Sequence, residues 1–261
     1  MLGERMPLAE LCPGLETEAV LTAYCRGRTG LLADDGARWA VLILPGGGYE
    51  RIAPAEEEPV ALAFAAAGVQ SFVLSYSVLP ARWPRQFLEG AAALAWMRRH
   101  AGEYGFCPDR VAVCGFSAGG HLAGCLACLW DHPILKEALG LAPAQVRPDA
   151  SILCYPVVNE GRYLSPLGGG EELRLDRRVR PDHPPAFLWA TAGDATVPAE
   201  NTLDYARALR ENGVPFELHI FQDGPHAMGL ADRESARDEA HYNAHAAAWH
   251  GLCVDWLKGR S

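Results

Sequence analysis

Short apolar runs alternate with longer amphipathic ones along most of the 261-residue chain. The short runs are nearly continuous in apolar residues and are bounded by Pro, Gly or Asp, which is typical of strands covered on both faces of a parallel sheet. Strands are predicted at residues 18–25, 39–44, 70–76, 110–114, 150–155, 186–191 and 215–221. Helices are predicted at residues 55–67, 84–101, 118–130, 200–212 and 234–257. The alternation predicts an α/β fold, a doubly wound and mostly parallel sheet with helices on both faces.

Residues 156–185 interrupt this alternation. The segment combines scattered prolines, a run of three glycines and several arginines, and it has no clear helical or strand period. An irregular stretch of this length in a compact α/β domain is more often functional than idle. Two interpretations stay open, a small cap over the site and a solvated surface loop. Because no linker or internal repeat divides the chain, residues 1–261 are predicted to form a single domain.

The charge balance narrows the choice of partners. The chain has 23 Lys and Arg against 32 Asp and Glu, a net charge of −9. This argues against nucleic acid or an anionic membrane as the main partner, because both bind basic surfaces. A small-molecule substrate is the expected partner, and a homo-oligomer is compatible with the sequence.

The positions of the cysteines and the length of the apolar runs bear on the cellular location of the protein. Most of the eight cysteines lie within apolar runs, where free cysteines act as small hydrophobic residues. Cys125 and Cys128 have redox-pair spacing, but they fall within a predicted helix without a second pair, so core packing is expected. The first residues lack the apolar core of a signal peptide, and no run has the 18 apolar residues of a membrane span. A cytoplasmic location is therefore expected.

Two polar clusters are assigned no chemistry. His241 and His245 have a zinc-compatible spacing on the predicted helix 234–257, but no Glu follows His241 and no third ligand is evident. Surface histidines are expected there, and no metal or other cofactor is predicted. The acidic run Glu56–Glu58 is expected to begin a helix, where acidic side chains suit the helix dipole.

Ser117 is the candidate nucleophile. It lies in Gly115-Phe-Ser-Ala-Gly119, directly after a β-branched run and before a predicted helix. A serine between two glycines suits a sharp strand-to-helix turn that lifts its hydroxyl above a sheet. Glycine on both sides lets the strand and the helix approach closely.

An activated serine needs a base and a group that orients the base. Asp194 follows the predicted strand 186–191, and His226 follows the predicted strand 215–221. Both therefore emerge at the carboxyl edge of the sheet, where α/β enzymes place their sites. Asp223 is a competing acid, since it lies three residues before His226. The other histidines considered as the base have weaker positions: His100, His121, His132, His183 and His219.

Three glycines, Gly46–Gly48, follow the predicted strand 39–44. Their N–H groups can turn toward a developing negative charge on a substrate oxygen. The N–H of Ala118, at the start of the helix after Ser117, is the expected second donor, because a helix N-terminus also favours an anion. A phosphate-binding loop is not indicated, because neither a following Lys-Ser/Thr nor a G-x-G-x-x-G pattern is present.

The motifs together resemble the α/β-hydrolase superfamily. The segments that carry the resemblance are Pro45–Tyr49, Gly115–His121, Gly193–Pro198 and Gly224–His226. More narrowly, the chain resembles acetyl-esterase and xylan-esterase-like carbohydrate esterases, which are related to His-Gly-Gly-Gly esterases and prolyl-oligopeptidase-like hydrolases. Pro45 stands where many relatives carry histidine. The resemblance covers residues 18–258 and implies Ser117 as nucleophile, Asp194 as acid and His226 as base. It also implies Gly47 and Ala118 as oxyanion donors, with Gly46 as the alternative to Gly47.

The implied activity is that of a serine hydrolase that cleaves short-acyl, chiefly acetyl, esters through an acyl-enzyme. Acetylated sugars or xylo-oligosaccharides are the implied substrate class. An amidase or peptidase with the same triad is the alternative, and a non-catalytic binding protein is a third. Tyr49 and Trp83 flank loops expected to border the site. Stacking on a sugar ring and ordinary packing both stay open for these two rings.

Overall fold

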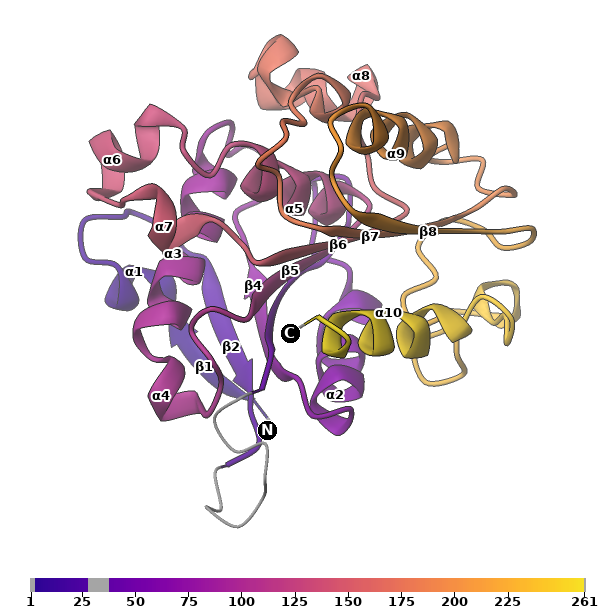
Figure 1. The fold of residues 1–261 in the computed structure, drawn as a ribbon, viewed down its shortest axis with the longest axis horizontal. Coiled ribbons are helices and arrows are strands. Elements are labelled where there is room, and N and C mark those ends of the chain that lie inside the picture. The colour runs from indigo at the N-terminus through magenta and orange to yellow at the C-terminus, as the bar shows by residue number, and fades with distance from the viewer. Residues whose placement is uncertain (1–2, 28–37, 261) are drawn as a thin grey trace.

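A computed structural model describes residues 3–27 and 38–260 and contains one eight-stranded sheet (Figure 1). The strand order is β1-β2-β4-β3-β5-β6-β7-β8. The strands are β1 (Glu4–Pro7), β2 (Val20–Tyr24), β3 (Ala40–Leu44), β4 (Gln70–Ser75), β5 (Val111–Phe116), β6 (Ala150–Cys154), β7 (Ala186–Thr191) and β8 (Phe216–Phe221).

The sheet is parallel from β4 to β8 and antiparallel at β1 and β2. In the central pair, Leu42 of β3 lies beside Val113 of β5. The predicted fold class is thus confirmed, and each predicted strand is present. Only β1 was not predicted, because its sequence Glu-Arg-Met-Pro is short, charged and largely exposed, and so carries no apolar signal.

Helices cover both faces of the sheet. The longer helices are α2 (Glu58–Ala66), α3 (Arg85–Arg99), α5 (Ala118–Cys128), α9 (Glu200–Glu211) and α10 (Ala248–Lys258). The shorter ones are α1 (Leu8–Leu11), α4 (Ala101–Tyr104), α6 (Pro133–Leu139), α7 (Pro143–Val146) and α8 (Gly161–Leu164). Helices α3, α5 and α9 pack on one face, and α2 and α10 on the other (Figure 1).

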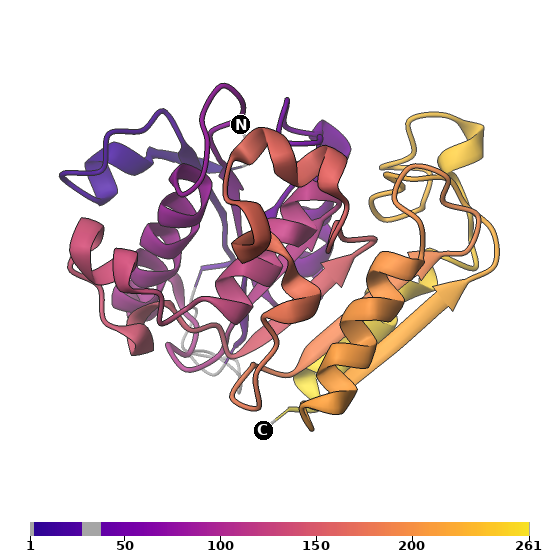
Figure 2. The same cartoon turned by 90° about the horizontal axis from the view of Figure 1, so that it is seen from above.

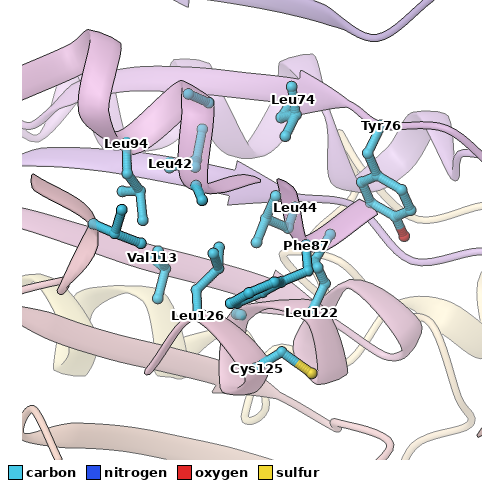
Figure 3. Packing of buried hydrophobic residues seen from close by; sticks show 14 of the residues in the cluster. Leu42, Leu44, Leu74, Tyr76, Phe87, Leu94, Val113, Leu122, Cys125 and Leu126 are labelled. Carbon is cyan, nitrogen blue, oxygen red and sulfur yellow. The ribbon is translucent and has the colours of Figure 1, made fainter. Parts of the chain in front are cut away.

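Side-chain alternation along the strands produces two hydrophobic cores. Leu42 and Leu44 of β3 point to the face of α3 and α5, whereas Val41 and Ile43 point to the face of α2 and α10. Figure 3 shows the first core, where leucines of β3 meet side chains of α3 and α5. Burial on both faces explains why these strands read as continuous apolar runs.

The helix predicted at 234–257 is wrong over its first half. Residues Glu239–His241 form a 3₁₀ turn, η5, and α10 begins only at Ala248. The side chain of Asp238 accepts the N–H of Ala240. The side chain of Asn243 accepts the N–H groups of His245 and Ala246. These local bonds replace helical ones. His241 and His245 therefore do not share a helix face.

The segment 156–185 is a packed, irregular covering. In addition to α8 it holds three 3₁₀ turns, η2 (Ser165–Leu167), η3 (Gly170–Leu173) and η4 (Leu175–Arg177). Each of these four pieces buries one leucine in the core that contains α5 and α9. Figure 2 shows the segment, in salmon, crossing over α5. The expectation of a purely solvated loop is therefore wrong.

Within the described ranges, no helix has both the length and the apolar character required to cross a bilayer.

Candidate active site

Ser117 lies at a sharp turn between β5 and α5. Its backbone has φ 53° and ψ −116°, a conformation that residues other than Gly rarely adopt. A Cβ atom on Gly115 would lie 2.1 Å from the carbonyl oxygen of Gly119. A Cβ atom on Gly119 would lie 2.0 Å from the carbonyl oxygen of Leu44. Both glycines are thus required for the backbone to pass so closely, as the motif predicts.

The structure brings Ser117, His226 and Asp194 together in a hydrogen-bonded chain. The Nε2 atom of His226 lies 2.7 Å from the Oγ atom of Ser117, and its Nδ1 atom lies 2.6 Å from Oδ2 of Asp194. The Asp194 side chain is fully buried. Its second oxygen accepts the N–H groups of Thr196 and Val197 at 2.8 and 2.9 Å. These bonds satisfy the carboxylate and fix its orientation toward the imidazole.

The competing residues lie elsewhere. Asp223 is exposed, and its carbonyl oxygen accepts a hydrogen bond from Asn243. His121 is buried between the hydroxyl of Tyr49 and the carbonyl of Leu173, and burial lowers the pKa of its imidazole to about 4. The remaining histidines contact other partners, which are Trp96 for His100, Glu172 for His132, Tyr205 for His183 and Glu217 for His219.

The structure distinguishes between the two candidate donors, Gly46 and Gly47, in the oxyanion loop, residues 46–48. The N–H of Gly46 donates to Oε2 of Glu56 at 2.7 Å, so it is not available to a substrate oxygen. Gly47 has φ 123°, and in the described part of the chain its N–H donates to no other group. Ala118 begins α5, where the first N–H groups have no intrahelical acceptor. The geometry therefore favours Gly47 and Ala118 and disfavours the alternative, Gly46.

Glu56 and Tyr155 were missed by the sequence analysis. The acidic run does lead into a helix, since α2 begins at Glu58, but Glu56 itself lies in the preceding turn η1 (Pro54–Glu56) and is 1% exposed. The Tyr155 hydroxyl donates to Oε1 of Glu56 at 2.8 Å. Burial raises the pKa of Glu56, and the hydrogen bonds from Tyr155 and Gly46 oppose that rise. No local pattern distinguishes this Glu from its two acidic neighbours.

A cavity of about 540 Å³ opens beside Ser117 and His226. Its lining residues come from the oxyanion loop and the chain after it, from the turn after β5, from α8, and from the loops after β7 and β8. They are Gly47, Gly48, Glu50, Arg51, Ala53, Pro54, Ala55, Glu56, Ser117, Tyr163, Thr196, His226, Ala227 and Arg237. The cavity is large enough for a small ligand. Tyr163, in the covering segment, was not singled out from the sequence.

The structure does not bring Tyr49 and Trp83 to this cavity. Tyr49 is 2% exposed, and its hydroxyl bonds to Nδ1 of His121 at 2.8 Å. Trp83 stacks on Phe87 with ring centroids 5.1 Å apart. Both rings thus make packing contacts, one of the two roles that the sequence left open. Among the described residues, no three His, Cys, Asp or Glu side chains are grouped to hold a metal ion.

Two family models match the chain. The model of the alpha/beta hydrolase fold matches residues 41–171, which include the oxyanion loop and Ser117. The model of the prolyl oligopeptidase family matches residues 160–251, which include Asp194 and His226. The two models together cover the chain from β3 to the start of α10.

Individual relatives agree with these models. Endo-1,4-beta-xylanase B of Butyrivibrio fibrisolvens is 36% identical over 217 residues, covering 77% of this chain and 34% of that protein. The chain spans only about two-fifths of the next curated relatives it matches. The crystal structure of the carboxylesterase Cest-2923 from Lactobacillus plantarum WCFS1 superposes with a TM-score of 0.89 at 27% identity, over 100% of this chain and 98% of that one.

A second solved structure is similar over almost its whole length. It is the acetyl ester-xyloside bifunctional hydrolase from Caldicellulosiruptor lactoaceticus, with a TM-score of 0.80, 30% identity, and coverage of 98% of this chain and 96% of that one. The matched family model, the strand order and this full-length similarity agree with one another. The chain therefore belongs to the α/β-hydrolase family of enzymes, as the sequence predicts.

Proposed function

We propose that the protein is a serine carboxylesterase that hydrolyses short-acyl, chiefly acetyl, esters. The observation that carries this proposal is the hydrogen-bonded chain from Ser117 through His226 to Asp194, which opens into the 540 Å³ cavity. Acetylated sugars or xylo-oligosaccharides are the proposed substrate class. The similarity to a xylanase and to an acetyl ester-xyloside hydrolase supports that class.

In the proposed acylation, Ser117 Oγ attacks the carbonyl carbon of the ester while its proton moves to Nε2 of His226. The carbonyl oxygen becomes an oxyanion and accepts the N–H groups of Gly47 and Ala118. Asp194 stabilises the positive imidazolium through Nδ1. The tetrahedral intermediate then expels the alcohol, which takes the proton from Nε2, and an acyl-enzyme remains on Ser117.

Deacylation repeats these steps with water as the nucleophile. His226 accepts a proton from water, the resulting oxygen attacks the acyl carbon, and the same two N–H groups hold the second oxyanion. Collapse of this intermediate releases the carboxylic acid and returns the proton to Ser117 Oγ. No metal or cofactor enters either half of the proposed reaction.

The proposal is tested with a series of p-nitrophenyl esters from C2 to C8, together with acetylated xylobiose. We expect the highest kcat/KM for the acetyl ester, and release of acetate from the sugar. Ser117→Ala should lower kcat by roughly 10⁴-fold or more, and it should abolish the mass increase after fluorophosphonate treatment. Ser165→Ala, at an exposed serine, is the matched control. Unchanged labelling of the Ser117→Ala variant would contradict the assignment.

An amidase or peptidase is the second candidate, because the prolyl oligopeptidase model matches residues 160–251. An aminopeptidase of that type needs acidic groups placed to bind the substrate amine. Glu50 and Glu56 are the acidic residues that line the cavity, and Glu56 is occupied by Gly46 and Tyr155. Ester hydrolysis is therefore favoured. Faster turnover of an aminoacyl p-nitroanilide or a formyl amide than of acetylated xylobiose would reverse this order.

A further inference from the structure

We propose that Glu56 is a positioning residue that holds the oxyanion loop and the loop of His226 in a fixed relation to each other. This inference rests on the proposed function, because it assigns Glu56 a part in the same reaction. Glu56 need not touch the substrate to act in this way. It acts through one backbone N–H on one side and one phenol on the other.

The first contact holds the oxyanion loop. The N–H of Gly46 donates to Oε2 of Glu56 at 2.7 Å, and Gly46 immediately precedes Gly47. The fit is close, since a Cβ atom on Gly46 would lie 2.7 Å from Oε2 of Glu56 and 3.0 Å from the Cβ atom of Ser117. Gly46 is thus held between the Glu56 carboxylate and Ser117. The direction of the next N–H, that of Gly47, depends on this position of Gly46.

The second contact reaches the histidine loop through Tyr155. The Tyr155 hydroxyl donates to Oε1 of Glu56 at 2.8 Å and accepts the N–H of Gly229 at 2.8 Å. Gly229 lies three residues after His226. The Tyr155 ring also packs edge-on against the His226 imidazole, with centroids 5.1 Å apart. Glu56 and Tyr155 therefore join the oxyanion donor to the base by a continuous path.

The cost of burying Glu56 indicates a task beyond stability. Glu56 is 1% exposed, and no Lys or Arg is paired with it in the described part of the chain. A buried carboxylate without a cationic partner is expensive, and well-packed apolar residues generally stabilise a core better. Its two oxygens instead accept one hydrogen bond each from groups that lead to the two loops.

The experiment compares four variants of the full chain. Glu56→Ala removes both contacts, and Glu56→Gln keeps an oxygen acceptor for Gly46. Tyr155→Phe removes only the phenol oxygen, and it keeps the proposal testable if Glu56→Ala does not fold. Glu58→Ala is the matched control, because Glu58 lies two residues away and is exposed. The measured quantities are kcat and KM for p-nitrophenyl acetate, the melting temperature, and the affinity for a trifluoromethyl ketone, whose adduct with Ser117 carries an oxyanion.

We expect Glu56→Ala to lower kcat on the order of 10²-fold and to change KM by no more than about twofold. The reason is that a misplaced N–H donor stabilises the transition state less well and leaves binding of the uncharged ester unchanged. Affinity for the trifluoromethyl ketone should fall in parallel. Tyr155→Phe should lower both by about tenfold, and Glu56→Gln should recover most of the loss. Glu58→Ala should match the wild type in every measurement.

The inference is overturned if folded Glu56→Ala or Tyr155→Phe keeps wild-type kcat and ketone affinity. It is also overturned if these variants lower only the melting temperature or raise only KM. Failure of the proposed function has a different signature. In that case the wild type itself neither hydrolyses the esters nor reacts with fluorophosphonate at Ser117.

Discussion

Two adjacent glycines in the oxyanion loop are required for different reasons. Gly46 has no room for a side chain, because Oε2 of Glu56 occupies the position that a Cβ atom would approach. Gly47 has φ 123°, and a Cβ atom there would lie 2.1 Å from the carbonyl oxygen of Arg51. At the residue scale, the loop therefore depends on the absence of side chains at two consecutive positions.

Gly47→Ala should impair the reaction more than the fold. The substitution displaces the proposed donor, and losing one such donor costs about 3–4 kcal/mol of transition-state stabilisation. We expect kcat for p-nitrophenyl acetate to fall by roughly 10²- to 10³-fold. Gly48→Ala is the control for backbone strain in the loop, since Gly48 also has a positive φ, 68°, but a Cβ atom there meets nothing nearer than 3.8 Å. Equal losses in the two variants would argue against Gly47 as a specific donor.

At the scale of elements, four strand ends assemble the site and one covering segment shapes its entrance. The loops after β3, β5, β7 and β8 supply the oxyanion loop, Ser117, Asp194 and His226. The covering segment adds Tyr163 from α8, whose ring lies near Gly48 and under the guanidinium of Arg162. The strand ends thus carry the proposed catalytic groups, and α8 contributes to the shape of the cavity.

Tyr163→Ala should therefore change selectivity rather than reactivity. Removing the ring enlarges the cavity, so we expect the ratio of kcat/KM for the octanoyl ester to that for the acetyl ester to rise by about tenfold. The rate of fluorophosphonate labelling should remain that of the wild type. Tyr163→Phe retains the ring and should retain the wild-type ratio. A ratio that does not differ between the Ala and Phe variants would exclude Tyr163 as a determinant of acyl size.

For the whole molecule, buried histidines link stability to pH. Burial lowers the pKa of His121, His183 and His250 to about 4 in each case. An unfolded histidine titrates near 6.5, so the unfolded chain binds protons first as the pH falls. The stability that these groups contribute is complete above about pH 6.5, and it is lost progressively as the pH falls toward 4.

His250 offers the cleanest test, because its Nε2 atom has no hydrogen-bond partner within the described residues. We expect the free energy of unfolding of the wild type to decrease between about pH 6.5 and pH 4, and His250→Leu to reduce that slope. Urea unfolding at several pH values measures both. Burial raises the pKa of Glu56, so the contribution of Glu56 to the free energy of unfolding increases as the pH falls. The effect of His250 is therefore measured as the difference in slope between the variant and the wild type. An unchanged slope would contradict the assignment of His250.

Most of the framework could be predicted from local patterns. A buried strand requires a run of apolar residues, and the turn at Ser117 requires glycines on both sides. The strands β3 to β8 and this turn could therefore be predicted from their own residues, without tertiary information. The helix prediction at 234–257 failed over its first half, because side chains of Asp238 and Asn243 accept backbone N–H groups that a helix would use. Glu56 was missed because its partners, Gly46 and Tyr155, lie 10 and 99 residues away.

The sequence by itself determined the fold class, the order of Ser117, Asp194 and His226, and the need for a glycine loop after β3. Only the tertiary structure decided which glycine N–H is free, which acid faces His226, and that Tyr163 rather than Tyr49 reaches the cavity. The physical reason is that a strand or a turn depends on residues adjacent in the chain. A free donor or a buried carboxylate depends on which distant groups the fold brings within hydrogen-bonding distance.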